Sequence, residues 1–358
     1  MLALLSVSLV ALSIEYAHAQ VVSFARTYGG GGADEAHSVQ QTSDGGYIAG
    51  GVTYTFGAGG GDIFLIKTDA YGNLQWAKTY GGTDNDWAFY VQQTSDGGYI
   101  VAGWTYSFGA GGGDIFLIKT DANGNLQWAK TYGGTSYDWA SSVQQTSDGG
   151  YIVAGWTHSF GAGGGDIFLI KTDANGNLQW AKAYGGTGDE YTWTSLQQTS
   201  DGGYIVVGYT NSFGAGDWDI LLIKTDAYGN LQWAKTYGGT GDEWRPFGRQ
   251  TSDGGYILAG WTRSFGAGGY DAFLIKTDAN GNIGSCGIVG SVFPAEMTLG
   301  SILTVNTISP AAISVNSVSL TTGSPAIYIN NPNLAISTPC PLSDDNELGI
   351  SESCKPVS

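Results

Sequence analysis

The chain is poor in the side chains that most often build catalytic and metal sites. Its 358 residues include three histidines and three cysteines. His18 lies in an apolar stretch at the N-terminus, which leaves His37 and His158 in the rest of the chain. Nucleophilic catalysis needs a nucleophile within reach of a base, and the sequence shows no such pair. No cysteine spacing fits a zinc site. We therefore expect no enzymatic activity and no resident cofactor.

Basic residues are also scarce. Lysine and arginine total 14, against 31 aspartates and glutamates, and the formal net charge is −17. A surface of this sign repels nucleic acids and anionic membranes. We therefore expect neither as a partner, and we interpret the acidity as an aid to solubility.

Long apolar runs are missing except near the N-terminus. The run from Leu2 to Ile14 is too short to span a bilayer, and Ala17-His18-Ala19 is a small-x-small cleavage site. Although no lysine or arginine precedes the run, we expect a signal peptide over residues 1–19, with an uncleaved anchor as the alternative. The protein is thus predicted to be secreted or held at the cell surface, without a membrane span after cleavage.

The chain is rich in repeats. The motif DGGY begins at Asp44, Asp96, Asp148, Asp201 and Asp253, at intervals of 52 or 53 residues. A fixed period of this size is typical of repeat architectures. Each unit contains four short runs rich in Ile, Val, Tyr, Trp and Phe, which suit β-strands. In the second unit these runs cover residues 87–94, 99–105, 114–120 and 126–131.

The segments between the runs have the composition of turns. Ser95-Asp96-Gly97-Gly98 and the DANGN sequence from Asp121 supply residues that tolerate the positive φ of tight hairpins. No run has helical spacing over a helix-sized window. Four antiparallel strands per unit, repeated around a circle, predict an all-β fold of the β-propeller type; an open solenoid is the alternative.

The two ends of the repeat region favour a closed ring. Val21 to Thr27 resembles the fourth run of a unit, while the fifth unit has IGSCG where its fourth run should be. We therefore predict that the N-terminal strand completes the last blade and closes a ring of five blades, residues 20–285.

The order of these motifs, from TYGG through DGGYIVAGWT to GDIFLIKTDANGNLQWAKTYGG, resembles the secreted bacterial and archaeal repeats called SBBP (seven-bladed β-propeller) repeats. The resemblance covers residues 21–282 approximately. It implies a propeller in an extracytoplasmic protein and brings no catalytic residues with it. The family name implies seven blades, whereas this chain offers five units.

The composition changes after the repeats. Residues 286–358 form a Ser/Thr-rich extension that we expect to be β-stranded or stalk-like. It could pack on the propeller, link it to the cell surface or add strands to a neighbouring molecule. All three cysteines lie here, and in a secreted protein we predict a disulfide between Cys286 and Cys340, with Cys340–Cys354 as the competing pair.

Oxygen-rich loops offer a weak calcium hypothesis. Asp121, Asn123 and Asn125 recur in equivalent hairpins, and such oxygens suit calcium. The spacing does not fit an EF-hand, so we favour the interpretation that these residues specify turns. The acids that follow each TYGG are interpreted as loop caps, with cation binding at one mouth of the ring as the alternative.

The best candidates for a binding surface are positions that vary while the rest of the unit repeats. Most are aromatic or basic: Trp87, Phe89, Tyr90, Tyr106, Trp139, His158, Trp193, Trp244, Arg245 and Arg263. Drift at exposed positions is the competing explanation. Tryptophans at recurring positions, such as Trp104, Trp156 and Trp261, are predicted to pack between blades.

These observations predict a non-catalytic structural or adhesive module that binds a protein or glycan at the cell surface, or itself through the tail. The alternative is a multivalent carbohydrate-binding propeller. A carbohydrate-active hydrolase is less favoured, because it needs two unlike carboxylates at one site and the acids here repeat in every unit.

Overall fold

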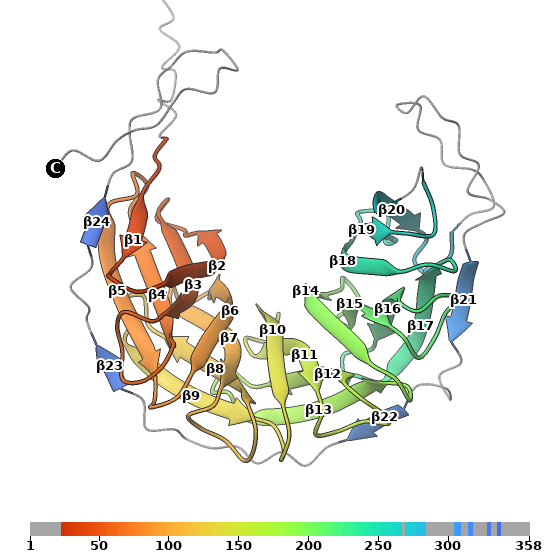
Figure 1. Cartoon of the computed structure of the whole chain (residues 1–358), viewed down its shortest axis with the longest axis horizontal. Helices are drawn as coiled ribbons and strands as arrows, with labels where there is room; N and C mark the ends of the chain where they lie inside the picture. Colours follow the sequence, from red (N-terminus) through yellow and green to blue (C-terminus); the bar gives the residue numbers. More distant parts are fainter. Residues whose placement is uncertain are drawn as a thin grey trace, which may run out of the picture.

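The computed structural model describes residues 23–266 and 269–283, together with four short strands at residues 304–308, 314–317, 328–330 and 335–337. Within these residues the secondary structure is entirely β, in five repeated antiparallel sheets that follow one another along an arc (Figure 1). The all-β prediction and the repeated four-stranded unit are confirmed.

We number the sheets in chain order. Sheet 1 contains β2 (Asp34–Gln41), β3 (Tyr47–Thr53), β4 (Asp62–Thr68) and β5 (Leu74–Gly81). Sheet 2 contains β6 (Asp86–Gln93), β7 (Tyr99–Thr105), β8 (Asp114–Thr120) and β9 (Leu126–Tyr132). Sheet 3 contains β10 (Asp138–Gln145), β11 (Tyr151–Thr157), β12 (Asp166–Thr172) and β13 (Leu178–Gly185). Sheet 4 contains β14 (Glu190–Gln198), β15 (Tyr204–Thr210), β16 (Asp219–Thr225) and β17 (Leu231–Gly238). Sheet 5 contains β18 (Glu243–Gln250), β19 (Tyr256–Thr262) and β20 (Asp271–Thr277).

The third strand of each unit explains how the sheets pack. In β12, Phe168 and Ile170 belong to the core between sheets 2 and 3. Ile167 and Leu169 belong to the core between sheets 3 and 4. Successive side chains point to opposite faces of a strand, so both faces are apolar where a sheet lies between two neighbours. This is why the sequence of this strand is almost continuously apolar.

A tyrosine at the end of each fourth strand ties one sheet to the next. The Tyr132 hydroxyl donates a hydrogen bond of 2.5 Å to the Gly176 carbonyl in the β12–β13 hairpin of the following sheet. Gly176 has a φ of 72°, a conformation that favours glycine. Equivalent bonds join Tyr80 to Gly124, Tyr184 to Gly229 and Tyr237 to Gly281. The tyrosine of the TYGG motif and the glycine of the NGN motif therefore form one contact between neighbouring sheets.

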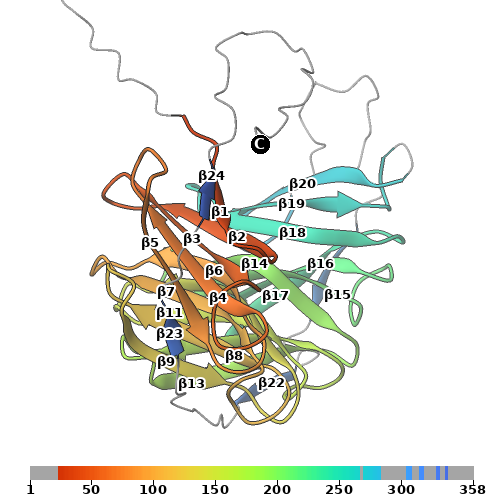
Figure 2. The same ribbon diagram turned by 60° about the vertical axis from the view of Figure 1, so that its left-hand side comes forward.

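Four strands of the C-terminal extension lie along the outer edge of the arc. β21 (Thr304–Ile308) pairs with β17, and β22 (Ser314–Ser317) pairs with β13. β23 (Tyr328–Asn330) pairs with β5, and β24 (Ala335–Ser337) pairs with β1 (Thr27–Gly29). The extension thus runs backwards past the sheets it follows in sequence (Figures 1 and 2).

The sheets are not closed into a ring, which corrects one prediction. β1 pairs with β24 and not with β20, and sheet 5 has three strands within the described residues (Figure 2). The similarity of Val21–Thr27 to a fourth strand indicated the type of strand. It could not indicate the neighbour, because any strand with an open edge can pair on that edge.

Several predictions concern residues outside the described part of the chain. These are the signal peptide at residues 1–19 and the disulfide between Cys286 and Cys340. Within the described residues no helix has the length and apolar character needed to cross a membrane.

Candidate functional site

Aromatic side chains from the first and second strands of sheets 2 to 4 form a continuous row. In each sheet one pair lies on neighbouring strands in register: Trp87 with Trp104, Trp139 with Trp156, and Tyr191 with Tyr209. We call these six residues, together with Trp218 and Trp244, the aromatic belt.

The belt continues from one sheet to the next. The rings of Trp104 and Trp139 are stacked, with centroids 5.4 Å apart and planes 13° apart. Trp156 lies 5.4 Å from Tyr191, and Tyr209 lies 5.0 Å from Trp244. Contacts of this geometry add to the stability of the pairs beyond the area that they bury. The belt is therefore both a connection between sheets and a partly accessible aromatic surface, because only Trp104 and Tyr209 among its members are buried.

The residue after the second strand of a unit and the residue before the third strand change together. In sheets 1 to 3 the first position has a ring and the second is glycine, as in Tyr54 with Gly61, Tyr106 with Gly113 and His158 with Gly165. A Cβ on Gly113 would lie 3.0 Å from the Tyr106 ring and 3.3 Å from Trp139 Nε1. Sheet 4 reverses the sizes, with Asn211 in place of the ring and Trp218 in place of the glycine. One large ring is thus kept beside the next sheet at each junction.

Most of the residues predicted from the sequence lie on or next to the belt. Trp87, Trp139 and Trp244 are members of it. Tyr106 packs 4.5 Å from Trp104, and His158 packs 5.0 Å from Trp156. Phe89 lies 6.3 Å from Trp87. Tyr90 differs, because it packs against the core between sheets 2 and 3.

The remaining predicted residues lie at the end of the belt, with Trp193 on β14 of sheet 4 and Arg245 and Arg263 in sheet 5. Trp193 Nε1 donates a hydrogen bond of 2.9 Å to the hydroxyl of Tyr209, a member of the belt. The Arg245 guanidinium lies over the rings of Trp193 and Trp261, at 5.8 and 5.4 Å from their centroids. Such cation–π contacts are stabilising. Arg245 has a φ of 50°, a left-handed conformation at the irregularity between β18 and β19. Arg263 lies 4.1 Å over the Tyr270 ring. Trp261, which we expected between blades, is 46% exposed.

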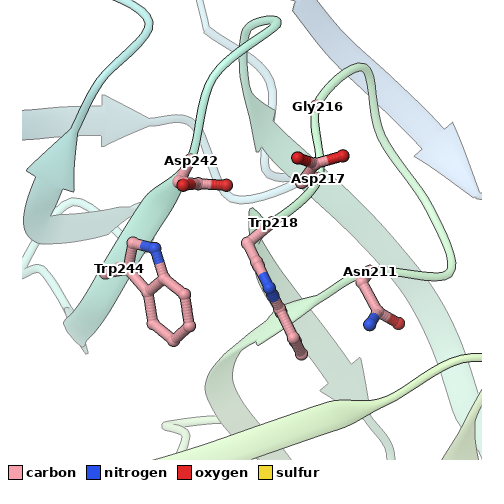
Figure 3. A pocket seen from close by; sticks show the side chains of 6 residues that line it. All are labelled: Asn211, Gly216, Asp217, Trp218, Asp242 and Trp244. Carbon is pink, nitrogen blue, oxygen red and sulfur yellow. The ribbon is translucent and has the colours of Figure 1, made fainter.

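The belt leads into an open pocket of about 610 Å³ at the junction of sheets 4 and 5. It is lined by Asn211, Gly216, Asp217, Trp218, Asp242 and Trp244. Figure 3 shows the two carboxylates beside one another at one edge, with both indoles extending away from them. The indole centroids are 5.3 Å apart and their planes are tilted by 39°. The pocket therefore combines an aromatic surface with several oxygen acceptors.

Sequence reasoning did not select Asp217 and Trp218. The signal was present, since GAGDWDI in the fourth unit replaces the GAGGGDI of the first three units. The variable positions selected from the sequence lie in the first run of each unit and directly after the second run, and not in the glycine-rich loop.

Carboxyl groups are paired inside the junctions between sheets. Asp114 in sheet 2 and Asp138 in sheet 3 are almost fully buried, and burial, with the neighbouring Asp138, raises the pKa of Asp114 to about 6. Burial and the charge of Glu190 raise the pKa of Asp166 to about 7. Asp62 and Asp219 are arranged in the same way, each with a pKa of about 6. Loss of solvation and a like charge both disfavour the ionised form.

The same carboxyl groups cap the loops. Asp138 Oδ2 accepts hydrogen bonds from the Gly134 amide at 2.8 Å and from Ser159 Oγ at 2.7 Å. Gly133 lies between the two carboxyl groups, and a Cβ on it would collide with Asp114. The buried acids after TYGG at the four junctions, Asp86, Asp138, Glu190 and Glu243, thus cap the loops that precede them.

The calcium candidates are used within their own hairpin. Asp121 Oδ1 accepts hydrogen bonds from the amides of Asn123 and Asn125, at 2.9 and 2.8 Å. Asn125 Oδ1 accepts a bond of 2.7 Å from Lys78 of the preceding sheet. Calcium needs six to eight oxygen ligands, and in the described part of the chain no group of three or more His, Cys, Asp or Glu side chains is close enough to hold a metal.

Two segments of the chain, residues 94–126 and 146–178, match the family model described as a domain of unknown function (DUF5122) β-propeller. With the repeated four-stranded sheets, this match supports a β-propeller repeat protein.

A curated relative gives a narrower comparison. The regulatory protein FlaEY of Caulobacter vibrioides is 32% identical over 141 residues, which cover 33% of this chain and 15% of that protein. The chain therefore spans a small part of the length of this relative.

Proposed function

We propose that this chain is a non-catalytic β-propeller binding module that acts outside the cell, as an adhesive or structural component of the cell surface. The predicted leader and the acidic composition support the location. The repetition of the acids in every junction supports a binding role over a catalytic one, because a catalytic site needs a unique arrangement of unlike groups.

The observation that carries the proposal is the aromatic belt with its pocket beside Trp218. Indole rings offer flat apolar faces, and carboxylates and amides bind hydroxyl groups. A sugar ring has both kinds of surface, with C–H groups on its faces and hydroxyls at its edge. Of the three functions considered from the sequence, carbohydrate binding therefore fits this arrangement best, with a saccharide chain lying along the belt.

The ligand should be neutral or cationic. Asp217 and Asp242 both border the pocket, and Arg263 lies 3.5 Å from Asp242. An anionic saccharide would be repelled by these carboxylates. We therefore propose neutral or amino-sugar-containing polysaccharides as the ligand class.

The test is a glycan array followed by calorimetry with Trp218→Ala. Losing an indole that stacks on the ligand should weaken binding by about tenfold, the effect of 1–1.5 kcal/mol of contact energy. Tyr228→Ala is the matched control, because Tyr228 is 74% exposed and follows β16 at the end opposite Trp218. It should bind as the unchanged protein does.

Two results would contradict the proposal. Failure to bind any glycan, with and without calcium, would exclude the carbohydrate ligand. Polysaccharide turnover that a single Asp→Asn change abolishes would exclude a non-catalytic role.

A structural role through assembly is the second candidate. Assembly through the tail was the expectation from the sequence, but strands β21 to β24 pair within the same chain. The support for assembly comes instead from the apolar surface at the two ends of the arc, where Val39 and Leu274 are 70% and 63% exposed.

A further inference from the structure

We propose that Arg245, together with Trp193 and Trp261, binds the carboxylate of an acidic sugar in the ligand chain. We call these three residues the arginine cluster. The inference rests on the carbohydrate binding proposed above and extends it, because it assigns a second point of recognition beyond the pocket at Trp218. The sugar in the pocket remains neutral or cationic, and its neighbour along the belt carries the acid.

The backbone at Arg245 turns this side chain outward. Its φ of 50° makes it the one residue other than glycine with a positive φ in the part of the chain that the structure describes. The equivalent Ala88 and Ala140 of sheets 2 and 3 are buried, whereas Arg245 is exposed and the next residue, Pro246, is buried. Backbone strain of this kind is concentrated at binding and active sites, so it points to a use for the outward arginine.

Trp193 reaches the same place because the first strand of sheet 4 is longer than the others. β14 has 9 residues, whereas the first strands of the other four sheets have 8. The extra residue widens the irregularity between Tyr191 and Ser195 and leaves Trp193 49% exposed. Bulges redirect side chains and are frequent next to active sites. Two departures from the repeat, in units four and five, therefore meet in one cluster.

Arg245 is available to an anion. Its guanidinium lies over the rings of Trp193 and Trp261, which leaves N–H groups at its edge. Within the described residues no carboxylate pairs with Arg245, whereas five lysines and Arg263 pair with aspartates. The planar guanidinium matches the two oxygens of a carboxylate. In a chain of net charge −17, an exposed arginine without an acidic partner fits an acid that the ligand supplies.

The arginine cluster is continuous with the pocket. Trp244, which lines the pocket, precedes Arg245 in the chain. The Trp244 ring lies 5.0 Å from that of Tyr209, whose hydroxyl accepts the hydrogen bond from Trp193 Nε1. A saccharide stacked on Trp244 therefore reaches Trp193 with a neighbouring sugar. Exposed indoles beside a cation suit a sugar ring that bears a carboxylate.

The experiment is calorimetry with a hexasaccharide of alternating glucosamine and glucuronic acid, and with the same hexasaccharide after reduction of its carboxyl groups. Arg245→Gln should weaken binding of the acidic form by about tenfold or more, as the loss of hydrogen bonds to a charged group does. It should change binding of the reduced form by less than about twofold, because the lost contact requires the carboxylate.

Arg249→Gln is the matched control. Arg249 is exposed on the same strand, and glutamine occupies the equivalent position in the other four units, as in Gln92. This variant loses the same charge and should leave both affinities within about twofold of the unchanged protein. Arg245→Lys keeps the charge without the planar fork, so it should retain only part of the affinity for the acidic form.

Equal losses for the two forms with Arg245→Gln would contradict the site, because they would show that the arginine only covers the indoles. Equal effects of Arg245→Gln and Arg249→Gln would contradict it as well, since they would indicate a general effect of charge. Binding of the acidic form that Trp218→Ala weakens and Arg245→Gln does not would overturn the arginine cluster and support the pocket. Binding of neither form would also overturn the cluster, and the glycan array would then decide separately on the proposed function.

Discussion

Strands β12 and β20 have nearly the same sequence, DIFLIKT and DAFLIKT, but different surroundings. Every residue of β12 is buried, whereas exposed and buried residues alternate through the middle of β20. The difference arises because sheet 3 has a neighbour on each face and a fourth strand, whereas among the residues that the structure describes sheet 5 has a neighbour on one face and three strands. Burial is therefore a property of the neighbours of a strand and not of its sequence.

The Lys–Asp ion pair that recurs in each unit shows a similar contrast at its lysine. Lys171 Nζ lies 2.9 Å from Asp148, and Lys276 Nζ lies 2.8 Å from Asp253. The Lys171 side chain is 4% exposed and the Lys276 side chain is 44% exposed. Lys171 also donates to Gln179 on the fourth strand at 3.1 Å. The ammonium is thus buried in sheet 3 and partly exposed in sheet 5, while both carboxylates lie near solvent, 55% and 63% exposed.

The largest expected effect concerns the apolar face. Leu169→Ala should lower the free energy of unfolding by about 3 kcal/mol, because it leaves a cavity between sheets 3 and 4. Leu274→Ala should cost less than about 1 kcal/mol, because this side chain is 63% exposed and its removal leaves no buried cavity. Chemical denaturation measures both. Equal losses at the two positions would show that sheet 5 has a neighbour on this face in solution.

Removing the lysine of the ion pair should lower the free energy of unfolding by different amounts in sheets 3 and 5, and this difference should be smaller than that between the two leucines. Lys171→Met should cost about 2 kcal/mol, because the hydrogen bonds of a buried ammonium are lost and Asp148 loses its partner. Lys276→Met should cost less than 1 kcal/mol, as for an exposed pair. Equal costs would mean that the two lysines have the same surroundings in solution.

The dependence on pH should be the smallest effect. The raised pKa values of Asp62, Asp114, Asp166 and Asp219 mean that the folded state binds more protons than the unfolded state between about pH 4 and 7. Stability therefore rises as pH falls from 8 to 5. Below about pH 4 the stability falls again, because protonation of Asp96 and Asp148 removes their ion pairs. The pKa values of these two carboxyl groups are lowered to about 2.

Calorimetry should show a melting temperature several degrees higher at pH 5 than at pH 8. Asp166→Asn should raise the melting temperature at pH 8 and not at pH 5, because the neutral amide removes the repulsion that acid removes in the native chain. Asp148→Asn is the control, and it should lower the melting temperature at both pH values. A flat profile for the native protein would contradict the role given to the buried carboxyl pairs.

Much of the local structure could be predicted from the sequence. The expected second and third strands of the second unit, residues 99–105 and 114–120, coincide with β7 and β8. The DGGY and DANGN motifs form the expected hairpins, as the bonds around Asp121 show. The prediction succeeded because strand length, turn residues and apolar pattern act over a few neighbouring residues.

The candidate site could be predicted only in part. The sequence pointed to Trp87, Trp139 and Trp244, because they interrupt a repeat. It did not show that Trp104 and Tyr209 would connect them into a row, since contacts between sheets depend on the packing of units 52 or 53 residues apart. It also did not show that Asp217 and Trp218 would border a pocket together with Asp242.

The sequence by itself determined the repeat, its strands and its turns, because these follow from short-range steric and hydrogen-bonding preferences. The tertiary structure decided which strand lies beside which. It placed β1 beside β24, carried the C-terminal strands back along the outer edges of earlier sheets, and left Leu274 exposed where Leu169 is buried. Identical residues differ in this way because solvation and packing are set by neighbours that are distant in the chain.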